Sequence, residues 1–198
     1  MDLQISVFLL FVLFTAGDSL SCYDCWNMTG SCVDQNEITC PSGFSQCLSA
    51  TTVYKFGQTS FIVNFKNCTD YCESGSMNFG FLKTSSSCCN TDLCNVQDGP
   101  DPSTNTPNGK KCYYCDEENC LNTVSCSGSE DHCFTLPVRN FSQEFLKGCV
   151  SKSYCEPLIS IHGEGFSCCS GNLCNVAENI TQSFLFLCCS LISFILLH

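Results

Sequence analysis

The sequence predicts an all-β, disulfide-rich protein made of two tandem domains, and three observations carry this prediction. The chain has 22 cysteines in 198 residues, more than the roughly 8–10% that is typical of disulfide scaffolds. A closing pattern Cys-Cys-x4-Cys-Asn occurs twice, beginning at Cys88 and at Cys168. Between the cysteines, apolar residues alternate in short runs instead of recurring at helical spacing, which is typical of β-strands.

Residues 1–19 are predicted to be a signal peptide. Residues 5–14 form an apolar run, and the small residues Gly17 and Ser19 precede a candidate cleavage position before Leu20. We therefore expect the mature chain to fold in the oxidising secretory pathway, where paired cysteines form disulfides.

The first domain is predicted at 20–96 and the second at 111–176, because the cysteines of these segments can be aligned one for one. Each copy is too short to bury a large core, so covalent cross-links are expected to supply stability. The aligned cysteines are Cys22, Cys25, Cys32, Cys40, Cys47, Cys68, Cys72, Cys88, Cys89 and Cys94 in the first copy, and Cys112, Cys115, Cys120, Cys126, Cys133, Cys149, Cys155, Cys168, Cys169 and Cys174 in the second.

Zinc is the alternative interpretation of closely spaced cysteines, and the Cys-x-x-Cys pairs at Cys22 and Cys112 are the candidates. The predicted secretory compartment favours disulfides over metal ligation and over a thioredoxin-like redox motif. We expect no metal and no cofactor.

Three hairpins are expected in each copy. In the first copy, 48–56 and 61–65 are predicted strands around a turn, and a further hairpin is predicted over 73–87. In the second copy, 134–138 and 141–146 form the equivalent pair, with Pro137 expected at an edge. The last hairpin of that copy is predicted over 156–167, turning near Gly163 and Gly165.

Residues 97–110 hold three prolines and no apolar period, so they are predicted to be an extended, solvated Pro-rich linker. At the other end, 184–197 form an uncharged apolar stretch shorter than the ~20 residues of a spanning helix. Residues 177–198 are therefore interpreted as a glycosylphosphatidylinositol (GPI) attachment signal, with Asn175 and Ala177 as candidate attachment residues. A short tail-anchor helix is the alternative.

The repeated motifs Cys-Tyr-x-Cys, a lysine shortly before the sixth cysteine and Cys-Cys-x4-Cys-Asn resemble those of the lymphocyte-antigen and urokinase-receptor family of three-finger, snake-toxin-like domains. The resemblance implies that Asn95 and Asn175 clamp the end of each domain to its base. It also implies a disulfide pairing that cysteine spacing alone does not select. The implied pairs are Cys22–Cys47, Cys25–Cys32, Cys40–Cys68, Cys72–Cys88, Cys89–Cys94, Cys112–Cys133, Cys115–Cys120, Cys126–Cys149, Cys155–Cys168 and Cys169–Cys174.

Function is predicted as binding and not as catalysis. Every domain cysteine is assigned to a bridge, and the histidines His132 and His162 have no serine in a nucleophile context. The resemblance implies a GPI-anchored receptor or co-receptor on the outer leaflet of the plasma membrane, with an extracellular or cell-surface protein ligand. A soluble two-domain inhibitor resembling secretory phospholipase inhibitors, or a toxin-like modulator of a membrane receptor, remains the alternative.

The aromatic residues Tyr54, Phe56 and Phe61 of the first copy are the candidate binding residues, since interface cores favour aromatic side chains. Packing of the first copy's aromatic residues, which include Phe65, Phe79 and Phe81, against each other or the second copy is the alternative. The formal net charge of −11 excludes nucleic acid as a partner. The sequons predict N-glycosylation at Asn27, Asn67, Asn140 and Asn179.

Overall fold

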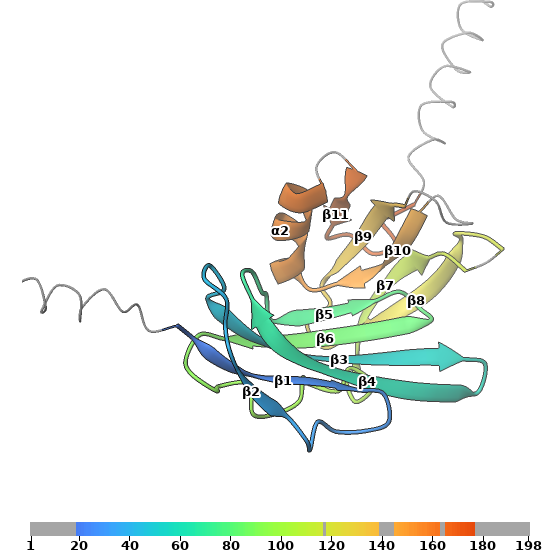
Figure 1. Ribbon diagram of the computed structural model, residues 1–198. Helices are drawn as coiled ribbons and strands as arrows, with labels where there is room; N and C mark the ends of the chain where they lie inside the picture. The colour runs from blue at the N-terminus through green and yellow to red at the C-terminus, as the bar shows by residue number, and fades with distance from the viewer. Residues whose placement is uncertain (1–18, 117, 139–144, 163–164, 177–198) are drawn as a thin grey trace, which may run out of the picture. The chain divides into compact units, whose positions relative to one another are not determined.

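The computed structural model describes residues 19–116, 118–138, 145–162 and 165–176, which form two compact units (Figure 1). Unit 1 runs to Ser76 and resumes over Leu82–Thr104. Unit 2 comprises Met77–Phe81 and the chain from Asn105 onward. The tip of the hairpin predicted over 73–87 therefore groups with the second unit.

Unit 1 is an antiparallel sheet with strand order β6-β3-β4-β1-β2, and β5 is hydrogen-bonded beside β6. Its long central strands lie side by side in Figure 1. The strands are β1 (Ser21–Asn27), β2 (Asn36–Thr39), β3 (Gln46–Phe56), β4 (Thr59–Thr69), β5 (Gly75–Asn78) and β6 (Leu82–Cys89).

The β3–β4 hairpin is the longest element of unit 1, and it extends further than the predicted strands at both ends. Its partners run without interruption from Gln46↔Thr69 to Phe56↔Thr59, so the loop is the two residues Gly57 and Gln58. Gly57 has φ 58°, which glycine adopts without a steric cost. Tight two-residue loops of this kind match the twist of the strands that they join.

Unit 2 contains a sheet of order β11-β9-β10 and a separate pair of strands, β7 and β8. Phe134 and Val150 are fully buried at its core, with Phe166 beside them and Met77 and Phe79 packed against the cluster. The strands are β7 (Pro107–Tyr114), β8 (Asn122–Ser127), β9 (His132–Pro137), β10 (Phe145–Val150) and β11 (Ser167–Cys169).

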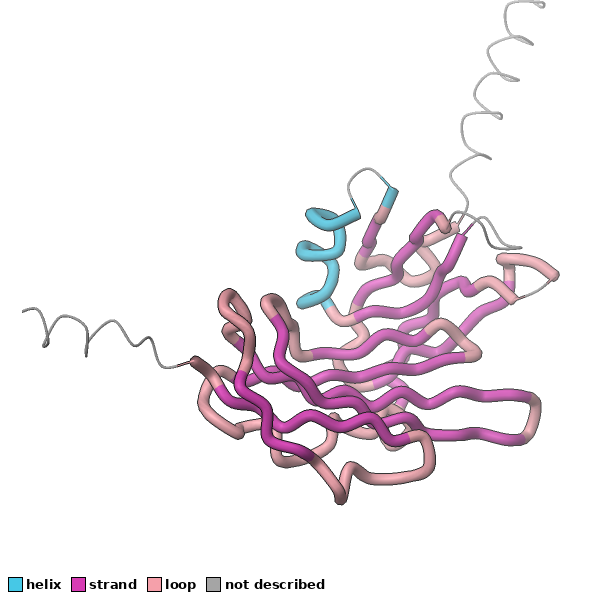
Figure 2. Tube along the Cα trace, in the orientation of Figure 1, coloured by secondary structure: helices cyan, strands magenta, loops and turns pink. Residues whose placement is uncertain are grey.

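The hairpin predicted over 156–167 is wrong. The first part of this segment belongs to helix α2 (Lys152–His162), drawn in cyan in Figure 2. Tyr154, Cys155 and Leu158 recur at helical spacing and pack against the core of unit 2, and Cys155 is bonded to Cys168. Pro137 lies at the end of β9, beyond the residues that pair with β11.

Ten disulfides hold the two units. In unit 1 they are Cys22–Cys47, Cys25–Cys32, Cys40–Cys68, Cys72–Cys88 and Cys89–Cys94. In unit 2 they are Cys112–Cys133, Cys115–Cys120, Cys126–Cys149, Cys155–Cys168 and Cys169–Cys174. These are the pairs that the family resemblance implies.

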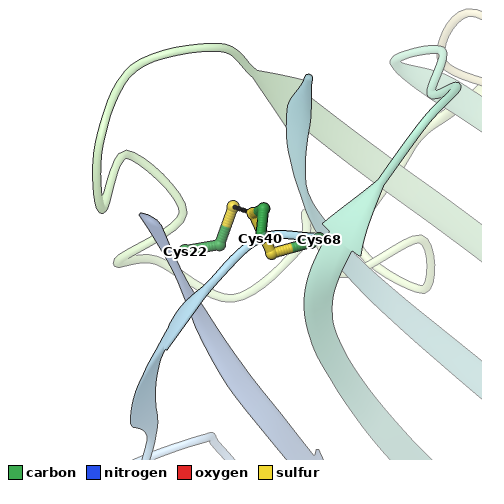
Figure 3. Close-up of side chains that lie close together, drawn as sticks. All are labelled: Cys22, Cys40 and Cys68. Atoms are coloured by element: carbon green, nitrogen blue, oxygen red, sulfur yellow. Dashed lines mark hydrogen bonds between the residues drawn. A yellow bond between two sulfur atoms is a disulfide. The ribbon is translucent and has the colours of Figure 1, made fainter. Parts of the chain in front are cut away.

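Two of these disulfides meet at the base of unit 1, where the sulfur atoms of Cys22 and Cys40 lie 3.2 Å apart (Figure 3). The sulfur of Cys68 completes a group of three within 4.8 Å of one another, and the equivalent group in unit 2 is Cys112, Cys126 and Cys149. Both groups are buried. Their sulfurs are engaged in disulfides, so these groups form the covalent core of each unit and do not present thiolates to a metal.

The closing asparagines occupy equivalent places in the two units. Asn95 accepts a hydrogen bond from the Tyr23 N–H and donates to the carbonyls of Tyr23 and Leu48. Asn175 does the same with the N–H and carbonyl of Tyr113 and the carbonyl of Phe134. Both side chains are buried, so each amide satisfies backbone groups that water cannot reach.

The solvated linker predicted over 97–110 differs from the structure. Residues 96–100, which we call the strap, are hydrogen-bonded to one face of the unit 1 sheet. Hydroxyls of Ser49, Thr51 and Ser85 donate to the carbonyls of Gln97, Gly99 and Pro100 at 2.7–2.8 Å. Strand β7 then begins at Pro107. The sequence did not predict that this segment binds the sheet, because the segment is held through its backbone carbonyls and therefore shows no periodic pattern of apolar side chains.

Candidate protein-binding face

Five aromatic side chains lie on one face of the unit 1 sheet. Residues directly opposite each other in antiparallel strands share a face, and the register pairs Trp26 with Phe65 and Tyr54 with Phe61. Side chains an even number of residues apart along a strand also share a face, which adds Phe56 to Tyr54, two residues away, and joins Phe61 to Phe65, four residues away. We call Trp26, Tyr54, Phe56, Phe61 and Phe65 the aromatic face.

The rings of the aromatic face contact one another while much of their surface stays open to solvent. Phe61 stacks on Tyr54 at 4.8 Å and on Phe56 at 5.7 Å between ring centroids, and Trp26 meets Phe65 edge-on at 5.6 Å. Phe56 is 65% exposed, Trp26 63% and Phe61 41%. Exposed aromatic side chains that are already ordered by their neighbours lose little conformational entropy when a partner covers them.

The opposite face of the same sheet is polar and covered. Ser49, Thr51, Asn64 and Lys66 are each at most 6% exposed beneath the strap. The Thr51 hydroxyl also lies 2.6 Å from Asn64 Oδ1. Because the strap covers this face, the aromatic face is the more exposed side of the β3–β4 hairpin.

The strap is held by a charged group at its centre. Lys66, 1% exposed, donates to Gln35 Oε1 at 2.7 Å and to the Val96 carbonyl at 2.5 Å, and its Nζ lies 3.2 Å from Asp98 Oδ1. Asp98 also accepts hydrogen bonds from the Ser31 hydroxyl and from the Cys32 N–H. This group joins the loop between β1 and β2, strand β4 and the strap.

Desolvation opposes ionisation of Asp98, but its hydrogen bonds outweigh this effect. The Ser31 hydroxyl, Lys66 and the Cys32 N–H all favour the carboxylate, so the pKa of Asp98 is lowered from its ordinary value. Asp98 is therefore an anion at neutral pH and a permanent partner for Lys66.

The structure brings the predicted binding residues Tyr54, Phe56 and Phe61 together as one continuous group of rings. Sequence reasoning missed Trp26, whose place directly after Cys25 is ambiguous until the register with β4 is known. Phe79 does not belong to this group, because it packs edge-on against Phe134 at 5.1 Å within unit 2.

Two of the four predicted glycosylation residues lie in the described part of the chain, on opposite faces of the sheet. Asn67 follows Phe65 by two positions and therefore lies on the aromatic face. Asn27 pairs with Asn64, on the strap side, and its amide donates to the Ser31 carbonyl at 3.0 Å. Asn140 and Asn179 lie outside the described residues, as do Ala177, the predicted signal peptide up to residue 18 and the predicted attachment signal.

His132 and its acidic neighbours Asp131 and Glu130 have structural partners in the described chain. His132 Nδ1 lies 2.9 Å from Asp131, which also accepts from the Lys152 N–H at the start of α2. Glu130 is buried and accepts a hydrogen bond from the Ser127 N–H at 2.8 Å. None of these contacts places a nucleophile beside a base.

The fold and its clamped, disulfide-bonded units define a class of protein: tandem three-finger domains. The family model described as "Snake toxin and toxin-like protein" matches residues 20–95 and 111–175, and the chain belongs to this family.

Curated relatives extend the similarity across both units. The chain is 29% identical to phospholipase A2 inhibitor CNF of Crotalus durissus terrificus, over 81% of this chain and 87% of that protein. It is 26% identical to phospholipase A2 inhibitor PIP of Malayopython reticulatus, over 81% and 86%. It is also 26% identical to the urokinase plasminogen activator surface receptor of Mus musculus, over 82% of this chain but only 56% of that receptor. By name these relatives are inhibitors and a receptor.

Proposed function

We propose that this protein is a GPI-anchored receptor or co-receptor of the cell surface that binds an extracellular protein through the aromatic face of unit 1. The observation that supports the proposal best is the exposure of Phe56, Phe61 and Trp26 on the one sheet face that the strap does not cover. In this proposal the protein acts by binding its ligand and not by catalysis.

The aromatic face has the chemistry of an interface centre. Aromatic side chains each bury about 150–250 Å² when fully covered, and covered apolar surface contributes about 25 cal/mol per Å². Three rings buried by a partner would thus contribute several kcal/mol before the cost of association. The relatives include a surface receptor and inhibitors of a protein, which supports a protein ligand.

A lipid anchor is supported by the composition of the C-terminal segment, where an apolar stretch follows small and polar residues. Among the residues that the structure describes, none of the helices has the length and hydropathy that a membrane crossing requires. Treatment of intact cells with phosphatidylinositol-specific phospholipase C should release the protein. Retention on the membrane with an intact C-terminus by mass spectrometry would contradict the anchor.

A soluble inhibitor of an extracellular enzyme is the second candidate. It is favoured by the inhibitors of phospholipase A2, which match both units at more than four fifths of their own length. Secretion of the wild-type chain into the medium in the absence of phospholipase treatment, with no lipid on the cell-associated form, would favour this candidate.

Binding through the aromatic face is tested by proximity labelling on intact cells. A labelling enzyme fused to the mature N-terminus should mark a specific neighbour, and excess soluble wild-type protein should compete for it. Protein carrying Phe61→Ala should compete at least tenfold less well, because hot-spot aromatic residues contribute ~2 kcal/mol or more. Equal competition by both proteins would place the binding surface elsewhere.

A further inference from the structure

One end of the aromatic face carries an N-glycosylation sequon. At the end of β4, Lys66 and Cys68 are buried, while the residues beside and between them are partly exposed. Phe65, Asn67 and Thr69 therefore share the other side of the strand. Asn67 and Thr69 are the acceptor and the hydroxyl residue of the sequon. The sequon thus lies on the same sheet face as the ring of Phe65.

The amide of Asn67 is held through its oxygen, which leaves its nitrogen to accept a sugar. Oδ1 accepts a hydrogen bond from the Cys68 N–H at 2.7 Å, and no described residue accepts one from Nδ2. At Asn27, by contrast, the amide nitrogen donates to the Ser31 carbonyl at 3.0 Å. A sugar on Nδ2 of Asn67 therefore displaces no contact that the structure describes.

The aromatic ring two residues before Asn67 gives the first sugar a surface on which to stack. Two residues along a strand span about 6.6 Å, which the asparagine side chain and one sugar ring can bridge. The apolar side of a sugar ring presents C–H groups, and these are attracted to the negative face of an aromatic ring. Trp26 meets Phe65 edge-on, an arrangement that covers one face of one ring only, so Phe65 keeps a ring face that Trp26 does not cover.

Trp26 is close enough to report on such a sugar. It pairs with Phe65 in the register of β1 with β4 and therefore lies diagonally across from Asn67. Diagonal neighbours in antiparallel strands are about 7–8 Å apart, so a sugar over Phe65 also shields part of Trp26, which is 63% exposed. Trp26 is the only tryptophan of the chain, and its fluorescence reports on this end of the aromatic face alone.

A glycan at this end obstructs a partner that uses the other end. A specific interface covers about 800 Å² of each protein, several times the ~150–250 Å² of one aromatic side chain. Phe65 follows Phe61 by four residues, or about 13 Å along β4. A protein seated on Phe56 and Phe61 therefore extends over Phe65 as well.

We propose that a glycan on Asn67 stacks its first sugar on Phe65 and thereby closes the Trp26 end of the aromatic face to a protein ligand. The inference rests on the proposed function of that face. In the transfer, Asn67 Nδ2 loses a proton and bonds to C1 of the sugar. The bond from C1 to the phosphate of a lipid-linked oligosaccharide breaks, and the lipid diphosphate leaves with the electron pair.

The neighbouring disulfide makes this modification incomplete. Cys68 is bridged to Cys40, which limits access to the sequon once the bridge has formed. Chains with and without the glycan on Asn67 therefore coexist, and only the chains without it bind through the whole aromatic face.

Two forms of one variant test whether the sugar covers the face. In the full chain with Asn27→Gln, Asn140→Gln and Asn179→Gln, Asn67 is the acceptor of the only sequon left, and a lectin column separates glycan-bearing from glycan-free protein. Acrylamide should quench the fluorescence of Trp26 about twofold less in the glycan-bearing form, because the sugar is bulky. Endoglycosidase treatment should remove this difference.

The role of Phe65 is tested by a matched pair of substitutions in the same variant. Phe65→Leu should abolish the difference in quenching between the two forms, because the sugar loses the ring on which it stacks. Phe56→Leu is the control at the far end of the aromatic face and should leave the difference unchanged. A difference that persists in Phe65→Leu would overturn the stacking.

The effect on binding is measured by competition for the labelled neighbour on intact cells. The glycan-free form should compete about tenfold better than the glycan-bearing form, since the glycan covers aromatic side chains of the interface. Equal competition by the two forms, equal quenching of the two forms, or the lack of any glycan on Asn67 would each overturn the inference.

Quenching needs no ligand, so its result separates this inference from the proposed function. If Phe61→Ala competes as well as its glycan-free parent, the proposed function fails, and the quenching comparison alone decides the stacking. If the triple variant is not exported, wild type is compared with Asn67→Gln. Weaker quenching of wild type in proportion to its glycan occupancy then supports the inference, and equal quenching overturns it.

Discussion

Replacing Asp98 by asparagine should loosen the strap and destabilise unit 1. The change removes the negative charge beside Lys66, which is 1% exposed and 3.2 Å from the carboxylate. An asparagine oxygen can still accept from Ser31 or from the Cys32 N–H. Lys66 keeps only its neutral acceptors, Gln35 and the Val96 carbonyl.

The size of the effect follows from how deeply the pair is buried. Removing one partner of a fully buried ion pair costs about 3–5 kcal/mol. Asp98 is 21% exposed and Lys66 retains two acceptors, so we expect a loss of about 2–3 kcal/mol. For a chain of this size that corresponds to a fall in Tm of about 5–10 °C at neutral pH.

The loss depends on pH with a definite sign. The pKa of Asp98 is lower in the folded protein than its ordinary value, so its contribution to stability is fully present above the unfolded pKa of about 3.9. That contribution is lost as the pH falls through the folded pKa. The Tm difference between wild type and Asp98→Asn should therefore be constant near neutrality and shrink in acid.

Thermal unfolding of the purified proteins, followed by circular dichroism from pH 7 down to acid, measures both the difference and its pH dependence. Asp101→Asn is the matched control, because Asp101 accepts its bonds from Ser103 in a local turn and an amide can do the same. A wild-type Tm for Asp98→Asn at pH 7, or a deficit that does not shrink in acid, would refute the reasoning.

Three further predictions concern the strap, the clamp and the glycans. Gly99→Ala should lower stability by about 1–3 kcal/mol, since its Cβ would lie 2.7 Å from backbone nitrogen of β3; an unchanged Tm would mean that the strap is not fixed there. Asn95→Ala should cost about 2–3 kcal/mol, because the backbone groups that it satisfies are buried, and denaturant unfolding measures this loss. Glycopeptide mapping should find Asn27 and Asn140 occupied ahead of Asn67, whose sequon contains the bridged Cys68; the reverse order would contradict the ranking.

The hairpins of unit 1 could be predicted because β-branched and aromatic residues alternate between well-marked turns. The strand pair around Gly57 needed only local information. The disulfide pairing could not be derived in this way, since ten cysteines per unit allow many connectivities, and it came from the family resemblance.

Two elements escaped prediction for physical reasons. Helix α2 is held by the packing of Tyr154 and Leu158 and by the Cys155–Cys168 disulfide. These contacts are not visible in the sequence, and the glycines that follow the helix favoured the prediction of a hairpin turn. The strap binds through backbone carbonyls to hydroxyls of β3 and β6, and such bonds leave no periodic pattern in the strap's own residues.

The candidate binding face was predicted in part. Tyr54, Phe56 and Phe61 lie close to one another in sequence on a single predicted hairpin, so their grouping follows from strand alternation. Trp26 joins them only through the register of β1 with β4, which is a long-range pairing. The sequence also did not show that the strap covers the polar face of the sheet and leaves the aromatic face exposed.

Site-specific photo-crosslinking on intact cells tests the central claim most directly. A photoreactive phenylalanine analogue at position 61 would report on the aromatic face, and the same analogue at Val33, which is 84% exposed outside that face, serves as the control. We expect a discrete protein adduct from position 61 that excess soluble wild-type protein abolishes, and none from position 33. Adducts that are the same from both positions, or that soluble protein does not reduce, would contradict the account.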